Sequence, residues 1–150
     1  MKQILIFTFL SISILFSNIT KGQTQSQCKK FTKTECLPTL DPYTYNGQLN
    51  SAILSEGDIA ELLLTFHEGH RYRISVCHED MIGDVKFKIF DTKKNLIFEQ
   101  TKENDQAFWD FISNSSQQLI IQVTVATELP KSEILKMGCV TILVGFLNEE

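Results

Sequence analysis

The sequence has little of what marks fibrous, low-complexity or nucleic-acid-binding proteins. Its 150 residues include only seven glycines and three prolines, too few for a collagen-like or low-complexity chain. The 14 basic residues are outnumbered by 18 acidic ones, so the basic footprint of a nucleic-acid-binding protein is missing. The hydrophobic fraction of 43% is too high for a disordered chain. A globular chain remains, and its length fits one domain better than two.

The sequence also lacks an apolar run long enough to cross a membrane as a helix. Ile4–Phe16 is a run of 13 residues without a charge, whereas a spanning helix needs about 20 residues. The run follows Met1-Lys2-Gln3 and precedes a polar stretch, which is the order of a secretory signal peptide. We therefore expect residues 1–22 to be a signal peptide cleaved after Gly22, and the mature chain to be secreted or periplasmic, without a transmembrane segment.

Two alternatives to a cleaved signal peptide stay open. The first is that the apolar run is a buried helix or strand of the fold. The second is a lipoprotein anchored through Cys28, although Gln25-Ser26-Gln27 in front of it is not a small and apolar set. With residues 1–22 removed, 12 basic and 18 acidic residues give the mature chain a net charge of −6.

Cysteine is scarce, and no two cysteines have the CxxC spacing of a zinc site. Cys28, Cys36, Cys77 and Cys139 are an even number, which in an oxidising compartment predicts two disulfides. Four cysteines allow three connectivities. We favour Cys28–Cys36, since no strand pattern separates them. We also favour Cys77–Cys139, because these residues would lie close together if the strands that they end and begin are antiparallel neighbours.

From Gly47 onward, short runs of strand-forming residues alternate with turn residues, which is typical of an all-β domain. The fold class predicted is a two-sheet antiparallel β-sandwich, jelly-roll-like, with about eight strands. The domain organisation predicted is a signal peptide over 1–22, an N-terminal segment with Cys28 and Cys36 over 23–46, and a β-sandwich domain over 47–147. The strands expected lie at residues 49–54, 59–66, 71–77, 85–89, 96–98, 107–112, 119–125 and 139–146.

Three local expectations are more specific. The strand expected at Ile59–Phe66 is apolar on both faces near Leu62-Leu63-Leu64, which favours a central strand. Glu68-Gly69 is expected to be the two-residue turn of a hairpin, with His67 and His70 facing each other across it. Leu129–Met137 is the one stretch with a weak helical pattern.

The block from Ala60 to Phe146 resembles the bacterial pre-peptidase C-terminal type of domain, a small secreted jelly-roll-like sandwich. The segments that carry the resemblance are Leu64-Thr65-Phe66, Gly69–Ile74, Val85–Asp91, Leu119–Val123 and Val140–Phe146. The mature chain is also similar to small exported proteins of Bacteroidetes-type bacteria, through Glu35–Pro38, Gly47–Asn50, Tyr72-Arg73 and Gly138-Cys139-Val140. The first resemblance implies a module that accompanies a secreted hydrolase, and the second brings no known activity.

Motifs that would carry catalysis or hold a metal are weak, so we expect no enzymatic activity, no cofactor and no metal. His67 and His70 with Glu68 are the alternative for a metal pair, and Cys77-His78 is the alternative for a thiol nucleophile. Neighbours on a strand point to opposite faces, which argues against the second. Calcium is a further alternative, without an EF-hand-type loop, at the acidic residues Asp80, Asp84, Glu99, Glu103, Asp105 and Asp110.

The densest aromatic segment is Ala107–Phe111. In a strand, Trp109 and Phe111 share the face expected to be buried, while Phe108 and Asp110 share the other. An apolar group among exposed polar ones can mark a binding face, so Phe108 and Asp110 are the ligand-binding residues expected. The function predicted is an exported accessory or protein-interaction module of the cell envelope that binds an unknown protein or envelope component. A glycan- or calcium-binding module is the alternative.

Overall fold

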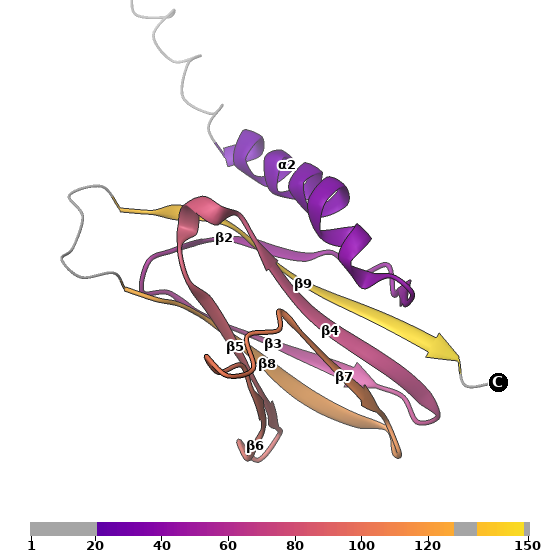
Figure 1. Cartoon of the computed structure of the whole chain (residues 1–150). Coiled ribbons are helices and arrows are strands. Elements are labelled where there is room, and N and C mark those ends of the chain that lie inside the picture. Colours follow the sequence, from indigo (N-terminus) through magenta and orange to yellow (C-terminus); the bar gives the residue numbers. More distant parts are fainter. Residues whose placement is uncertain (1–20, 128–134, 149–150) are drawn as a thin grey trace, which may run out of the picture.

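The chain forms two antiparallel β-sheets packed face to face, with a helical segment on the outside of one of them (Figure 1). This is seen in a computed structural model, which describes residues 21–127 and 135–148. The prediction of a two-sheet antiparallel β-sandwich is confirmed. The signal peptide expected over residues 1–22 lies almost wholly outside the described residues, as does most of the weak helical pattern at 129–137.

Sheet A contains five strands and sheet B contains four. In sheet A, β9 (Met137–Asn148) pairs on one side with β1 (Thr44–Tyr45) and β2 (Asn50–Ser55). On its other side β9 pairs with β4 (His70–His78), which also pairs with β7 (Phe108–Ile112). Sheet B has the order β3 (Ile59–Phe66), β8 (Gln117–Val125), β5 (Val85–Asp91) and β6 (Leu96–Glu99). Each predicted strand has its counterpart, and the two-residue β1 was not predicted.

From β2 onward every connection except that between β5 and β6 crosses from one sheet to the other. The hairpin predicted at Glu68-Gly69 is therefore wrong, because β3 lies in sheet B and β4 lies in sheet A. Gly69 has a positive φ of +82°, which glycine adopts without strain, but it serves a connection between sheets. The central position predicted for β3 is wrong as well, since β3 is an edge strand of sheet B.

The main core lies between the sheets and follows from the alternation of apolar residues along the strands. Val85, Phe87 and Ile89 of β5 lie beside Val125, Val123 and Ile121 of the neighbouring strand β8 on the inner face of sheet B, and all are at most 4% exposed. Trp109 and Phe111 of β7 pack against this core as predicted. Their rings are stacked with centroids 4.4 Å apart.

Residues 21–40 form the helical segment, which the sequence pattern did not reveal. The α-helix α2 (Lys21–Phe31) continues into the π-helix η1 (Thr32–Cys36) and the 3-10 helix η2 (Leu37–Leu40). A third short turn, η3 (Asp80–Ile82), follows β4. Within the ranges described, no helix is both long and apolar enough to span a membrane. Figure 1 shows α2 on the outer side of sheet A, away from sheet B.

Two disulfides join the helical segment to sheet A, and neither has the favoured pairing. Cys28 of α2 is bonded to Cys139 of β9, with Cα atoms 5.4 Å apart, and Cys36 of η1 is bonded to Cys77 of β4, with Cα atoms 5.7 Å apart. The strands β4 and β9 are antiparallel neighbours as expected, but Cys77 lies opposite Thr141. Cys139 is therefore only a diagonal neighbour, roughly 7–8 Å away, beyond the span of a disulfide. Cys28 and Cys36 are separated by two helical turns, roughly 12 Å.

Candidate functional site

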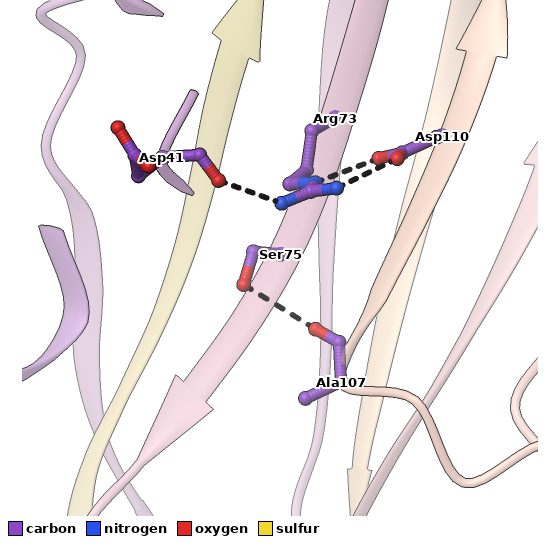
Figure 2. A network of polar contacts seen from close by, with 5 residues as sticks. All are labelled: Asp41, Arg73, Ser75, Ala107 and Asp110. Atoms are coloured by element: carbon purple, nitrogen blue, oxygen red, sulfur yellow. Dashed lines mark hydrogen bonds and ion pairs between the residues drawn. The ribbon is translucent and has the colours of Figure 1, made fainter. Parts of the chain in front are cut away.

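Phe108 and Asp110, the residues predicted to bind a ligand, lie on β7 at one edge of sheet A. In register, Arg73 of β4 lies opposite Asp110, and Ser75 lies opposite Phe108. Figure 2 shows the Arg73 guanidinium held between the Asp110 carboxylate and the backbone carbonyl of Asp41. The two residues therefore belong to a cluster that also contains Arg73 and the segment just before β1.

Arg73 is the centre of this cluster. Its Nε and Nη2 atoms each donate to a different oxygen of Asp110 at 2.8 Å, and Nη1 donates to the Asp41 carbonyl at 3.2 Å. The guanidinium carbon lies 4.1 Å from the centre of the Phe108 ring and 4.5 Å from that of the Tyr43 ring. A guanidinium suits this place because it combines a two-pronged donor with a flat face that stacks on aromatic rings.

The electrostatics of the cluster favour the charged arginine and the protonated tyrosine. The hydrogen bonds to Asp110 raise the pKa of Arg73 above its ordinary value. Burial raises the pKa of Tyr43, and the negative charge of Asp110 raises it further. Because both pKa values are raised, Arg73 stays charged and Tyr43 stays protonated at neutral pH. The cluster fastens the segment around Tyr43 onto sheet A, and ligand binding by Phe108 and Asp110 stays a prediction.

Sequence reasoning placed Phe108 and Asp110 on the correct face but missed Arg73 and Tyr43. The alternation of β4 does put Arg71 and Arg73 on one face. The alternation does not indicate which strand lies beside β4. No hairpin joins β4 to β7, so their pairing could not be predicted from the sequence.

We expect Arg73→Lys to lower the free energy of unfolding by about 2 kcal/mol, because a lysine ammonium can neither make the two-pronged bond nor stack between two rings. Urea unfolding followed by Trp109 fluorescence measures the change. The control is Lys88→Met, which breaks the exposed 2.7 Å pair with Glu99 and is expected to cost under about 1 kcal/mol. Equal losses in the two variants would show that the stacking of Arg73 contributes nothing.

His67 and His70 lie at one end of the open side between the sheets, in a hollow of about 270 Å³. The His70 ring is stacked on Tyr72 with centroids 5.9 Å apart, and its Nδ1 lies 3.2 Å from the Glu68 carbonyl oxygen. Asn46 also lines the hollow. No third histidine, cysteine or carboxylate joins the two histidines, since the residues described contain no group of three or more such side chains that could hold a metal ion.

The structure also bears on the two other chemical alternatives, a thiol nucleophile at Cys77-His78 and a calcium site. Cys77 is bonded to Cys36, so a Cys77-His78 thiol nucleophile is not available. Four of the six acidic residues considered for calcium are paired with cations instead. Asp84 and Asp105 contact Lys86, Glu99 contacts Lys88, and Asp110 contacts Arg73.

A second, apolar hollow lies further along the same open side, between the edges of β2 and β3. Its volume is about 230 Å³. Both strands contribute to its lining, and the inner faces of β8 and β9 form its floor. The residues that line it include Leu49, Ala52, Leu54, Ala60, Leu62, Val123 and Ile142.

Within the described residues, β3 pairs only with β8, and its second, free edge borders this apolar hollow. Its eight residues pair with β8 from Ile59 opposite Thr124 to Phe66 opposite Gln117, without a bulge. Proteins commonly protect such an edge with proline, lysine, a bulge or a very short strand. The strand β3 has none of these, and its one charged residue, Glu61, is bound to Lys94 and Gln122. The other edge strands, β1, β2, β6 and β7, have two to six residues.

The outer face of sheet B is not covered by another layer of the described chain. One row of side chains across it is apolar, because Leu63, Ile120, Phe90 and Leu96 are paired in register across the four strands. Leu63 is 53% exposed at the β3 edge, and Leu96 is 52% exposed at the β6 edge. The two ends of the row thus carry the same side chain in nearly equal exposure at opposite edges of one sheet.

Comparisons with known proteins gave a similar solved structure and no matching family. No protein-family model matches the chain, and no curated protein matches it either, so the resemblance to pre-peptidase C-terminal domains gains no support from them. Among solved structures, the chain is similar to the crystal structure of PliG from Aeromonas hydrophila, a periplasmic lysozyme inhibitor of g-type lysozyme. The TM-score is 0.49 at 11% identity, over 71% of this chain and 89% of that chain.

Proposed function

We propose that the protein is an exported, non-catalytic interaction module of the cell envelope, which binds an extended segment of a partner protein along the free edge of β3. The observation that carries the proposal is the juxtaposition of an unprotected eight-residue edge strand with an apolar hollow. Strand addition uses these two features, since backbone hydrogen bonds along the edge supply affinity and pockets for alternate side chains supply specificity.

The size of the apolar hollow favours a peptide over a small molecule. Sites for drug-sized ligands usually measure about 300–1,000 Å³, whereas this hollow measures about 230 Å³. It suits a few apolar side chains of a strand that lies beside Ala60 and Leu62. Export is supported by the two disulfides, which persist in oxidising compartments, together with the charge-then-apolar pattern of the first residues.

The test places a photo-crosslinking amino acid at Leu49, which lines the hollow and is 42% exposed. Irradiation of cells that export the protein is expected to give a discrete adduct with one envelope protein. Leu63→Lys adds to β3 the charge that protects natural edge strands and is expected to reduce the adduct about tenfold.

The matched control is Leu96→Lys, the same substitution at the other end of the same apolar row. It is expected to leave the adduct unchanged. Equal loss in both variants would show that the outer face of sheet B, not the β3 edge, is the binding surface. Absence of any adduct, or an adduct with a second copy of the chain, would contradict the proposed partner.

A further inference from the structure

The helical segment carries a charge opposite to that of the rest of the protein. In the chain expected after cleavage behind Gly22, residues 23–40 contain three lysines and Glu35, a net charge of +2. The described residues 41–127 and 135–148 contain eight basic and 13 acidic residues, a net charge of −5. The positive charge therefore lies on the outer side of sheet A, and the negative charge lies on the body of the sandwich. Such an asymmetry points to an anionic partner for the helical segment.

These three lysines form one exposed ridge. Cys28, Thr32 and Cys36, at four-residue spacing, are buried against sheet A. Lys29, Lys30 and Lys33 lie between them in the sequence and are all exposed. In the described part of the chain, no ion pair links any of these three lysines to an acidic side chain. We call Lys29, Lys30 and Lys33 the lysine ridge.

Folding does not account for the lysine ridge. Lysines near the end of a helix can stabilise it through the helix dipole, but the right-handed helical backbone continues through Phe31 and Leu37 to Leu40. Lys33 also lies three residues after Lys30 and four after Lys29, where like charges destabilise a helix. The ridge therefore costs some stability, and the two disulfides that flank it hold it in place.

From the charge asymmetry and the ridge, we propose that the lysine ridge docks the protein onto an anionic lipid bilayer. The ridge projects from a helical surface and is not a pocket, so its ammonium groups can meet a layer of lipid phosphates together. Lysine is a compact point charge that needs no fixed acceptor geometry, unlike arginine, and basic clusters are attracted to anionic lipid surfaces. The acidic body would then face away from the bilayer. This proposal is independent of the β3 edge, which lies in the other sheet.

The test uses the exported chain with both disulfides formed and vesicles of phosphatidylcholine containing about 30% phosphatidylglycerol. Cosedimentation is expected with these vesicles but not with pure phosphatidylcholine. Binding should fall steeply as salt rises from about 50 to about 500 mM, since salt screens exposed charges. Equal binding to both kinds of vesicle, or no binding to either, would overturn the proposal.

The variant Lys29→Glu/Lys30→Glu is expected to weaken vesicle binding at least about tenfold. It is expected to keep or raise the melting temperature, because each new carboxylate lies three or four residues before Lys33. Loss of binding therefore cannot be attributed to unfolding.

The matched control is Lys93→Glu/Lys102→Glu, which changes the net charge equally at two exposed residues of the sandwich. It is expected to change binding less than about threefold. Equal weakening by both double variants would show that only net charge matters. Capture by immobilised polyglutamate without vesicle binding would favour an acidic protein partner. Either result would overturn the lipid-docking proposal.

Discussion

Replacing both Cys28 and Cys139 by alanine is expected to lower the free energy of unfolding by about 4 kcal/mol. The bond joins residues 111 positions apart, and the chain-entropy model assigns about 4.7 kcal/mol to a loop of roughly 100 residues. The Cys36–Cys77 bond lies inside this loop and shortens its flexible part, which reduces the effect somewhat. Urea unfolding under non-reducing conditions, followed by the fluorescence of Trp109, measures the loss.

The control is the double variant Cys36→Ala/Cys77→Ala, which opens a loop of 41 residues. The same chain-entropy model assigns roughly 3.9 kcal/mol to it, slightly less than to the longer loop. Peptide mapping without reduction should recover Cys28 with Cys139 and Cys36 with Cys77. Recovery of Cys77 with Cys139 would contradict the pairing and the placement of the helical segment together.

The strands were predictable because alternation records which side chains a strand buries. In β5, Val85, Phe87 and Ile89 alternate with lysines, and this pattern alone indicates a strand with one buried face. Alternation does not record which strand lies next to which. The positions of β3 and β4 in separate sheets, and of β3 at an edge, depend on the six connections that cross from one sheet to the other, and no local residue encodes that.

The helical segment was missed because its sequence gives no helical signal. The α2 sequence, KGQTQSQCKKF, is polar apart from Cys28 and Phe31, so it lacks the apolar stripe that marks an amphipathic helix. Its place is fixed by long-range contacts instead. These are the two disulfides and a buried hydrogen bond between the Thr32 and Thr141 hydroxyls, with the oxygens 2.8 Å apart. The same cause explains the incorrect disulfide pairing.

The candidate site was predictable to the same extent as the strands. The alternation in β7 placed Trp109 and Phe111 inward and Phe108 and Asp110 outward, as the structure has them. The partner of Asp110 is Arg73, which is 37 residues away in sequence. Neither the sequence around Arg73 nor that around Asp110 predicts that the two residues are paired. The free edge of β3 was hidden for the same reason, since its apolar sequence reads equally well as a central strand.

The strand β9 shows why the helical segment is a layer of the fold. Val140, Ile142 and Val144 face the core between the sheets, while Leu143 faces outward and is fully buried. Leu143 forms a second core with Cys36 and Leu40 of the helical segment. A strand that is buried on both faces needs cover on both, and residues 21–40 supply the outer cover.

Leu143→Ala is therefore expected to lower the free energy of unfolding by about 3 kcal/mol, as for other large-to-small changes at fully buried leucines. Chemical unfolding with the disulfides intact measures the change. The control is Ile59→Ala. Ile59 is 63% exposed on β3, so this substitution is expected to lower the free energy of unfolding by about 0.5 kcal/mol or less. If Leu143→Ala cost no more than Ile59→Ala, the second core would contribute nothing to stability, and residues 21–40 would be an appendage held only by its disulfides. A loss near 3 kcal/mol would make the helical segment part of one cooperative unit with the sandwich, and the lysine ridge would then be a fixed feature of the folded surface.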